Sequence, residues 1–413
     1  MSEWRDVPLR DLCDSVQYGL TASASDEGAD GPQLLRITDI VPPRIDWKAV
    51  PVCDASGTAT NKYQLRSGDI VVARTGATVG HAKYLDHPPS RAVFASYLVR
   101  FQVGRGADPA YVGHIVQSAA YKQFVLAHAG GAAQPNANAK TLGAFPVPLP
   151  SLSTQRRIAA LLSAFDELIE INERRIEVLE ELARSLYREW FVRFRFPGHA
   201  AVDFTDSDVG PLPEGWRVAA FAAIGEFLNG YAFKPSHWGD EGIPIIKIKE
   251  LKQGVTTATP RYGGVDLESR YFVEPGDLLF SWSADLGVYL WAGERGALNQ
   301  HLFKVSPTAG IGRAYLYYSL EAALPRFRSR AQGTTMKHIK RSALMEVDCV
   351  LPDQVLQAAF SETVGPMHEE VLTLKNEVAM LAATRDLLLP RLVTGRLDIS
   401  EIALGALLPA EAA

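Results

Sequence analysis

The longest continuous pattern of hydrophobic and polar positions lies near the middle of the chain, from Leu149 to Phe194. This stretch contains no glycine, and no proline after Pro150, so nothing inside it stops a helix. Its apolar residues recur about every 3.5 residues, which is the spacing of the contact stripe of a helix in a coiled coil. The pattern predicts a long helix, residues 151–195, that packs against another helix.

A second stretch with the same spacing, residues 353–399, predicts the partner helix, and Gly365-Pro366 is expected to break or kink its beginning. We call the shared apolar stripe the seam. Its predicted positions are Ile158, Leu162, Phe165, Ile169, Asn172, Ile176, Leu179, Leu186, Leu374, Val378, Leu381 and Leu388. Asn172 and Arg385 depart from the apolar pattern. Both could simply reach solvent, or a buried Asn172 could set the register of the two helices.

The rest of the chain contains an internal repeat. Five segments of the first half resemble five segments of the second half, and their offsets fall smoothly from 212 to 211, 208, 204 and 202 residues. The pairs are WRDVPLRDLCDSVQYGL (from Trp4) with WRVAAFAAIGEFLNGYA (Trp216), QLLRITDI (Gln33) with PIIKIKEL (Pro244), YQLRSGDIVVAR (Tyr63) with YFVEPGDLLFSW (Tyr271), SYLVRF (Ser96) with QHLFKV (Gln300), and FPVPLPSLSTQ (Phe145) with VDCVLPDQVLQ (Val347). A smooth decline indicates one shared fold with small loop deletions.

Each copy is predicted to be a module of mixed α and β structure. Short β-rich runs such as 69–73 and 277–280 follow a Gly-Asp turn, and helices are expected at 109–128 and 312–331. The fold class is therefore α+β, not a parallel doubly wound sheet. The predicted organisation is a first module (1–150), a long helix (151–195), a linker (196–213), a second module (214–352), a second long helix (353–399) and a tail (400–413).

Charge is distributed unevenly along the chain. The 413 residues carry a formal net charge of −5, yet the stretches Pro109–Phe165 and Ala322–Met345 contain no acidic residue and several basic ones. Basic stretches of this kind suit contacts with phosphates. No apolar run is long enough to span a membrane and no signal peptide opens the chain, so a cytoplasmic location is expected.

Signals for catalysis or metal binding are weak. The three cysteines are scattered singly and the nine histidines show no metal-ligand spacing, so no metal site is expected. There is no phosphate-binding GxxxxGK[ST] loop and no Asn/Asp-Pro-Pro-aromatic motif of adenine methyltransferases. No catalytic residue is predicted.

The complete order of segments resembles one family. Module, helix, module and helix, with LPSLSTQRRIAALL, SLYREWFVRFRFPG, the linker GPLPEGW and the closing LLLPRLVTGRLDI, are similar to the specificity (S) subunit of type I restriction-modification enzymes from Trp4 to about Ile399. The resemblance implies two target recognition domains, each reading one half of a bipartite, asymmetric site in double-stranded DNA. It also implies that the helices form an antiparallel coiled coil that spaces the modules and docks methyltransferase (M) subunits, two in number.

The same resemblance implies a noncatalytic subunit without a cofactor of its own. S-adenosylmethionine, ATP and Mg²⁺ would be bound by the partner methyltransferase and restriction (R) subunits. The predicted DNA-binding residues lie in the acid-free stretches and in equivalent loops of the two modules, where amide, basic and hydroxyl side chains could contact bases or phosphates. They are Arg36, Arg74, Thr75, Thr78, Gln134, Asn136, Asn138, Lys140, Lys247, Lys249, Ser281, Trp282, Lys337, His338, Lys340 and Arg341.

Two other functions remain open on the sequence. Asp240, Glu250 and Lys252 resemble the carboxylate and lysine set of Mg²⁺-dependent nucleases, with Glu250 and Lys252 on a predicted strand. A match this short arises easily by chance. Alternatively, the chain could be a coiled-coil scaffold whose modules bind protein, although the basic stretches disfavour this.

Overall fold

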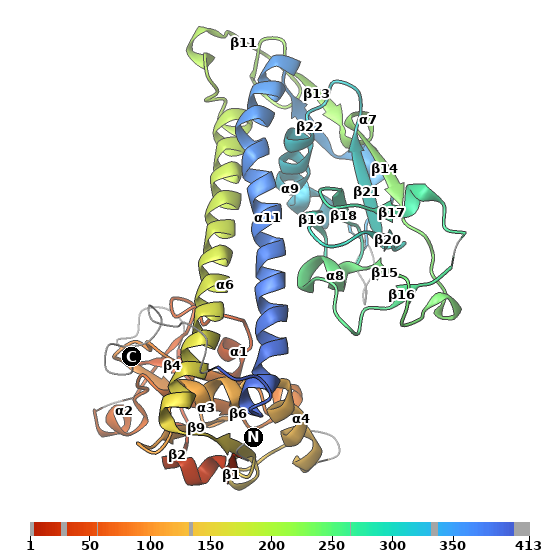
Figure 1. The fold of residues 1–413 in the computed structure, drawn as a ribbon. Helices are drawn as coiled ribbons and strands as arrows, with labels where there is room; N and C mark the ends of the chain where they lie inside the picture. The colour runs from red at the N-terminus through yellow and green to blue at the C-terminus, as the bar shows by residue number, and fades with distance from the viewer. Residues whose placement is uncertain are drawn as a thin grey trace. The chain divides into compact units, whose positions relative to one another are not determined.

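The computed structural model describes residues 4–25, 31–55, 57–131, 135–264, 266–331 and 338–399. These residues form two compact units. Unit 1 is the described part of Met1–Glu170 and Leu381–Ala413, and unit 2 is the described part of Ile171–Met380. Each unit contains one of the two repeated modules together with parts of both long helices (Figure 1).

Module 1, from β1 to β10, contains two four-stranded sheets and a separate strand pair. The strand orders are β2-β9-β6-β7 and β3-β5-β4-β8, and β1 pairs with β10. The strands are β1 (Arg5–Pro8), β2 (Cys13–Tyr18), β3 (Ala24–Ser25), β4 (Gln33–Leu35), β5 (Val52–Cys53), β6 (Asp69–Ala73), β7 (Ala82–Leu85), β8 (Ala92–Phe94), β9 (Leu98–Val103) and β10 (Pro146–Leu149). The helices are α1 (Ile37–Ile40), α2 (Gly57–Tyr63), α3 (Pro109–Val116), α4 (Ala119–His128), α5 (Ala139–Leu142) and the short 3-10 turns η1 (Leu9–Leu12) and η2 (Gly76–Thr78).

Module 2, from β13 to β22, repeats the first sheet and the separate strand pair, and its second sheet shares three strands with that of module 1: β16-β15-β20 corresponds to β5-β4-β8, while the fourth strand is β17 beside β20 in place of β3 beside β5. Its sheets have the orders β14-β21-β18-β19 and β16-β15-β20-β17, and β13 pairs with β22. The strands are β13 (Arg217–Ala220), β14 (Gly225–Asn229), β15 (Ile243–Ile246), β16 (Arg261–Tyr262), β17 (Phe272–Val273), β18 (Leu278–Ser281), β19 (Gly287–Leu290), β20 (Gly296–Leu298), β21 (Leu302–Pro307) and β22 (Asp348–Leu351). The helices are α7 (Phe221–Ile224), α8 (Ile248–Gln253), α9 (Arg313–Ser329) and α10 (Ala343–Glu346). In both modules one pair of the second sheet is parallel, β4 with β8 and β15 with β20. The predicted α+β class and the predicted repeat are confirmed.

The register of the strands explains the first step in the repeat offset. β2 and β9 pair with a shift between Cys13 and Ser15, so that Asp14 is an extra residue on β2. The equivalent pair in module 2, β14 with β21, continues without a shift from Gly225 to Asn229. A β-bulge adds one residue to one strand only. The bulge at Asp14 therefore accounts for the fall of the offset from 212 to 211.

One buried glutamine joins each module to the long helix that follows it. In unit 1, Gln155 accepts a hydrogen bond from the Asp108 backbone N–H (2.9 Å) and donates one to the Pro150 carbonyl (2.9 Å). In unit 2, Gln357 does the same with the Gly312 N–H and the Pro352 carbonyl, both at 3.0 Å. The two glutamines are only 1% and 2% exposed. Each side chain satisfies a donor and an acceptor that would otherwise be buried without a partner.

The long helices form as predicted. The first is α6 (Leu152–Tyr187), which continues as a π-helical turn, η3 (Arg188–Val192), and the second is α11 (Gln354–Val393). α11 is unbroken at Gly365-Pro366, so the predicted break is wrong. The twelve predicted seam residues are all buried or half-buried. In unit 2, Ile176 packs with Val371 and Leu374 at the centre of this seam.

The two polar seam residues are held by partners. In unit 2, Asn172 is 7% exposed, and its side-chain N–H donates to Glu377 Oε2 on α11 at 3.0 Å. In unit 1, Arg385 of α11 forms an ion pair with Asp166 of α6. The interpretation that both side chains simply reach solvent is therefore wrong. The contact of Asn172 agrees with a role in helix register, because its hydrogen bond to Glu377 forms only when the two helices are aligned so that these residues lie opposite each other.

The end of each long helix packs against a module. In unit 1, Leu392 of α11 is fully buried in the core of module 1, where Trp4 also packs. In unit 2, Trp190 and Phe191 of η3 join the core of module 2, and the Phe191 ring lies 5.0 Å from the Tyr315 ring. α9 lies beside α11 in the same unit, with the sheets of module 2 on its other side (Figure 1). Among the described residues, no helix is both long and apolar enough to cross a membrane.

We expect Gln357→Leu to lower the thermal unfolding midpoint of the chain. The substitution keeps a side chain of similar size but leaves the Gly312 N–H and the Pro352 carbonyl without partners, at a cost of about 1–3 kcal/mol for each group. Differential scanning calorimetry measures the effect. Gln354→Leu, an exposed position on the first turn of the same helix, is the matched control, and an equal shift in both variants would contradict the role of Gln357.

Stability is also expected to depend on pH through His368. This side chain is 6% exposed, its Nε2 lies 3.0 Å from the Tyr318 hydroxyl, and burial, helped by Arg313 and Lys375, lowers its pKa to about 4. The unfolded chain, with an ordinary histidine pKa of about 6.5, binds the extra proton first as pH falls. The contribution of the buried, neutral His368 to the free energy of unfolding is therefore fully present above pH 6.5. It is lost as the pH falls from there towards 4, at about 1.4 kcal/mol per pH unit. His368→Gln should flatten the fall in unfolding midpoint between pH 7 and pH 5, whereas His87→Gln, at an exposed histidine, should not. Equal slopes for wild type and His368→Gln would exclude this contribution.

Candidate nucleic-acid interface

The ends of three chain segments meet at the same place in each module. In module 1, Arg74 follows β6, and its backbone accepts a hydrogen bond from the Ala137 N–H (2.9 Å) and donates one to the Tyr97 carbonyl (3.0 Å). In module 2, Trp282 follows β18 and makes the same two bonds, with the Ile339 N–H (3.0 Å) and the His301 carbonyl (3.3 Å). The next residues form an isolated bridge in both modules, Thr75 with Asn136 and Ser283 with His338.

A fourth segment, the end of β2 or of β14, reaches the same place through a glycine. The Gly19 N–H bonds the Leu98 carbonyl (3.2 Å), and the Gly230 N–H bonds the Leu302 carbonyl (3.0 Å). A Cβ atom at either glycine would lie 2.2 Å from a backbone oxygen, of Ala95 or Asn299. Only glycine permits so close an approach of two backbones.

We call the four side chains gathered here the strand-end edge. In module 1 they are Tyr18, Arg74, Tyr97 and Asn136, and in module 2 they are Asn229, Trp282, His301 and His338. Tyr18 and Asn229 are equivalent because they face equivalent residues of the neighbouring strand, Val99 and Phe303. The backbone is the same in both modules, but all four side chains differ.

In module 1 the edge combines a cation with tyrosine rings. The Arg74 guanidinium lies over the Tyr18 ring, 5.0 Å from its centre, and the Tyr18 hydroxyl accepts a bond from the Ala139 N–H at 3.0 Å. Tyr18 is 41% exposed and Tyr97 is 60% exposed. Arg74 Nε is buried, and no hydrogen-bond partner for it exists among the described residues. The Tyr18 ring orients the guanidinium, so that a flat donor group is held against a partly exposed aromatic ring.

In module 2 the edge combines an indole with two imidazoles. Trp282 Nε1 donates to Asn229 Oδ1 and to the Gln300 carbonyl, both at 3.1 Å. The Trp282 ring lies 5.8 Å from the His301 ring and 6.5 Å from the His338 ring, measured between centres. This edge presents an indole and imidazole rings where module 1 presents a guanidinium, and both ring nitrogens of His301 contact neighbouring side chains, Ser283 at 3.0 Å and Gln300 at 3.4 Å. Two edges with one backbone and different hydrogen-bonding groups can bind two different ligand surfaces.

Several predicted DNA-binding residues have structural partners as well. Asn138 Oδ1 accepts from the Thr141 N–H (2.9 Å) and caps α5. Arg36 forms an ion pair with Asp39 (2.9 Å), and Lys247 Nζ lies over the Trp238 ring, 4.2 Å from its centre. Arg341 donates to the Phe227 carbonyl at 3.2 Å.

The remaining predicted residues fall into four groups. Asn136, Lys140, Lys249 and Lys340 are exposed, and Thr75, Thr78, Trp282 and His338 are half-buried. Gln134 and Lys337 lie outside the described residues. Ser281 is fully buried, and its hydroxyl donates to the Asp285 carbonyl (2.5 Å) and accepts from the Gly287 N–H (2.8 Å). Because it closes the β18–β19 turn and has no exposed surface, the prediction that Ser281 contacts DNA is wrong.

The nuclease-like residues have structural roles too. Glu250 lies on α8, not on a strand, is 2% exposed, and accepts from the Lys247 N–H (3.1 Å) and the Thr259 hydroxyl (3.1 Å). Asp39 makes the equivalent helix cap in module 1 by accepting from the Arg36 N–H at 2.8 Å. Lys252 forms an ion pair with Asp285. Within the described ranges, no group of three or more His, Cys, Asp or Glu residues could hold a metal ion.

Four edge residues were not predicted: Tyr18, Tyr97, Asn229 and His301. The repeat contained the signal for Tyr97 and His301, which occupy matching positions of the aligned segments SYLVRF and QHLFKV. Tyr18 and Asn229 were hidden, because the bulge at Asp14 shifts their true alignment by one residue relative to the sequence match from Trp4.

Comparison with known proteins identifies the family. A family model described as the type I restriction modification DNA specificity domain matches residues 1–181, which contain module 1 and most of α6, and residues 213–363, which contain module 2 and the start of α11. The chain belongs to this family. Its members are DNA specificity domains, and this chain contains two of them, at equivalent positions of the repeat.

Individual proteins that are similar to this chain support its membership of the family. The MjaIX specificity subunit of Methanocaldococcus jannaschii is 24% identical over 307 residues, which cover 72% of this chain and 71% of the relative. The HindI specificity subunit of Haemophilus influenzae is 20% identical over 468 residues, covering 96% and 100%. The crystal structure of a type I restriction-modification S subunit from M. genitalium has the same fold, with a TM-score of 0.59 at 15% identity over 94% of this chain and 96% of that chain.

Proposed function

We propose that this chain is the noncatalytic DNA-recognition subunit of a type I restriction-modification complex. Each module reads one half of a bipartite, asymmetric site in double-stranded DNA through its strand-end edge. The observation that carries this proposal is the edge itself: one backbone arrangement, repeated in two modules, presents four different side chains in each. The repeat supports two independent recognition events, and the difference in side chains supports two different half-site sequences.

The chemistry of the edges suits base recognition. Arginine donates two hydrogen bonds to guanine and asparagine pairs with adenine in the major groove, so Arg74 and Asn136 give module 1 two base-reading groups. In module 2, Trp282 and His338 provide aromatic rings, and His301, whose Nδ1 lies 3.0 Å from the Ser283 hydroxyl and whose Nε2 lies 3.4 Å from the Gln300 amide, holds its ring beside them. Lys140 and Lys340 are exposed beside the edges, in stretches without acidic residues, and suit phosphate contacts that strengthen binding without selecting sequence.

The long helices would set the distance between the half-sites. α6 has 36 residues and α11 has 40, which at about 1.5 Å per residue correspond to roughly 54–60 Å of helix. A helix pair of that length is a stiff element. Two modules fixed to such a pair by Gln155 and Gln357 would read half-sites at a defined spacing.

One face of α6 in unit 2 suits the docking of methyltransferase subunits. Ile171, Val178 and Leu182 are 54%, 59% and 46% exposed, and their spacing of seven and four residues places them on one side of the helix. A hollow of about 390 Å³ lies on this side, lined also by Arg174, Leu179 and others. Apolar residues at this spacing are typical of a surface that receives another helix. In this proposal two methyltransferase subunits bring S-adenosylmethionine, and restriction subunits bring ATP and Mg²⁺.

We expect Arg74→Ala and Trp282→Ala to alter different halves of the recognised site. In the assembled complex, loss of a base contact costs about 1–3 kcal/mol at the position read. The Arg74 variant should relax specificity at one half-site only, and the Trp282 variant at the other only, as measured by sequencing of methylated DNA. Lys48→Ala, an exposed lysine of module 1 outside the edge, should leave both halves unchanged. If either edge variant changed both half-sites together, independent reading by two modules would be refuted.

We also expect the double variant Ile171→Glu/Val178→Glu to weaken assembly with methyltransferase subunits. Both positions are exposed, so the unfolding midpoint of the chain alone should stay close to that of wild type. Charges in an apolar helix contact should lower the affinity for the partner by about tenfold or more, measured by surface plasmon resonance. Val355→Glu, an 80% exposed valine on the first turn of α11, is the matched control. Unchanged binding by the double variant would show that the methyltransferase subunits dock on a different surface.

A further inference from the structure

Module 2 carries a surface hollow lined by aromatic rings. Its volume is about 690 Å³, and its walls include Tyr231, His237, Trp238 and Tyr262. The His237 ring lies 6.1 Å from the Tyr231 ring and 6.2 Å from the Tyr262 ring, measured between centres. Trp238 is 47% exposed. A group of rings that remains partly open to solvent is unusual on a protein surface unless it contacts a ligand.

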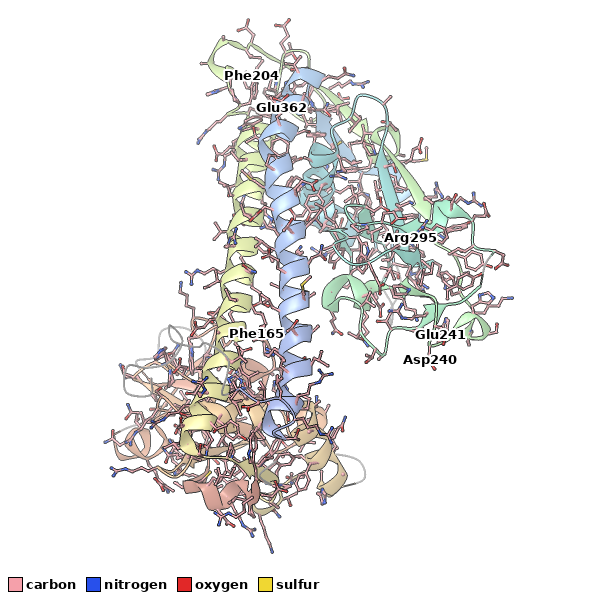
Figure 2. The ribbon with its side chains drawn as sticks, in the orientation of Figure 1. Phe165, Phe204, Asp240, Glu241, Arg295 and Glu362 are labelled. Atoms are coloured by element: carbon pink, nitrogen blue, oxygen red, sulfur yellow. The ribbon has the colours of Figure 1, made fainter. Side chains whose placement is uncertain are left out.

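Carboxylates surround the same hollow. Asp240 and Glu241, both exposed, lie in the loop that precedes β15, where Figure 2 labels them. Asp266 accepts a hydrogen bond from the Tyr262 hydroxyl, and this bond holds the pKa of the Asp266 carboxyl below its usual range, so that it is ionised. Aromatic rings with carboxylates beside them attract cations in two ways, through cation–π interactions with the ring faces and through the negative charge of the carboxylates.

The hollow already shows a cation on one of its rings. Lys247 Nζ lies over the Trp238 ring, 4.2 Å from its centre. This contact within the chain demonstrates that a wall of the hollow accepts a positive group. It leaves the other rings, which line the hollow with Asp266, for a ligand.

The repeated scaffold does not require aromatic residues at two of these positions, although in module 2 Tyr262 packs against Phe233 and Ile245. By strand register and repeat offset, Tyr231 is equivalent to Leu20 and Tyr262 to Cys53 in module 1. There the same place is a hydrophobic cluster in which Leu20 and Cys53 pack with Leu34, Val93 and Ala95, and Tyr63 lies at its edge. Because one scaffold folds with either set, the aromatic and acidic residues of module 2 point to a ligand specific to that module.

We propose that this hollow binds the guanidinium group of an arginine on a basic segment of a partner protein. A guanidinium is planar, stacks on tyrosine and tryptophan faces, and donates paired hydrogen bonds to a carboxylate. A nucleobase of DNA or RNA would also stack on the rings. Its nucleotide, however, carries a negatively charged phosphate, which Asp240, Glu241 and Asp266 repel. The charges therefore favour a basic protein segment over nucleic acid.

The test uses the full chain and a hexa-arginine peptide, with binding measured by isothermal titration calorimetry. Wild type should bind the peptide more tightly than an uncharged hexa-citrulline peptide of the same shape. Tyr231→Ala, at a 37% exposed ring of the hollow that Lys247 does not cover, and the double variant Asp240→Asn/Glu241→Gln should each weaken binding of hexa-arginine by about tenfold. The matched control is Glu268→Gln/Glu274→Gln, which removes two exposed carboxylates of the same module outside the hollow and should change affinity by about twofold or less.

Three outcomes would overturn the proposal. Equal effects of the hollow and control variants would show that the peptide binds through general charge. Equal binding of hexa-citrulline would show stacking without charge recognition. Binding of a single-stranded oligonucleotide that competes with hexa-arginine and is lost in Tyr231→Ala would assign the hollow to a nucleobase. A further variant, Tyr262→Phe, keeps the ring but removes the hydroxyl that bonds Asp266. Its fold is compared with that of wild type by circular dichroism, and its peptide affinity by calorimetry. Weaker peptide binding with an unchanged fold supports the site.

Discussion

The architecture depends on one buried hydrogen-bonded contact made twice, by Gln155 and by Gln357. Each glutamine bonds a backbone N–H at the start of a module helix and a carbonyl at the end of the last module strand. A long helix attached through a flexible loop could not transmit the orientation of its module. Because the amide group bonds both parts in fixed directions, the helix leaves the module at a defined angle. The fixed direction that the proposed function requires of each helix relative to its module depends on this attachment.

The second constraint is the backbone arrangement at the strand-end edge. Gly19 and Gly230 allow two strands to approach so closely that a Cβ would collide with a carbonyl. The hydrogen bonds of Arg74 and Trp282 to the neighbouring segments use backbone atoms only. The side chains at these positions add contacts that differ between the modules, but the shared backbone bonds do not depend on them, so the residues can differ while the backbone stays the same. This separation of scaffold from side chain explains how two modules with the same topology present a guanidinium on tyrosine in one case and an indole with imidazoles in the other.

Much of this structure could be predicted from the sequence, because its elements repeat or have clear periods. The seam of α6 follows from the spacing of its apolar residues alone. The declining offsets predict that the two modules share one fold, and the strand orders of the modules are consistent with this. The errors have physical causes. Pro366 lies inside an unbroken helix, since proline removes only one donor and packing along α11 outweighs that loss. Ser281 looks like a polar loop residue in sequence, but its hydroxyl satisfies buried backbone groups of a tight turn.

Residues of the site were harder to predict than the fold for a related reason. A one-residue bulge at Asp14 shifts the alignment, so Tyr18 and Asn229 become equivalent only when the strands are paired. Glu250 and Lys252 resemble a catalytic pair in sequence, whereas the cap that Glu250 makes is visible only with the backbone, and Asp39 makes the same cap in module 1. A repeated residue with a repeated partner indicates a scaffold role. By the same argument, a repeated position whose residue and partner both change, as at Arg74 and Trp282, is where specificity can differ without cost to the fold.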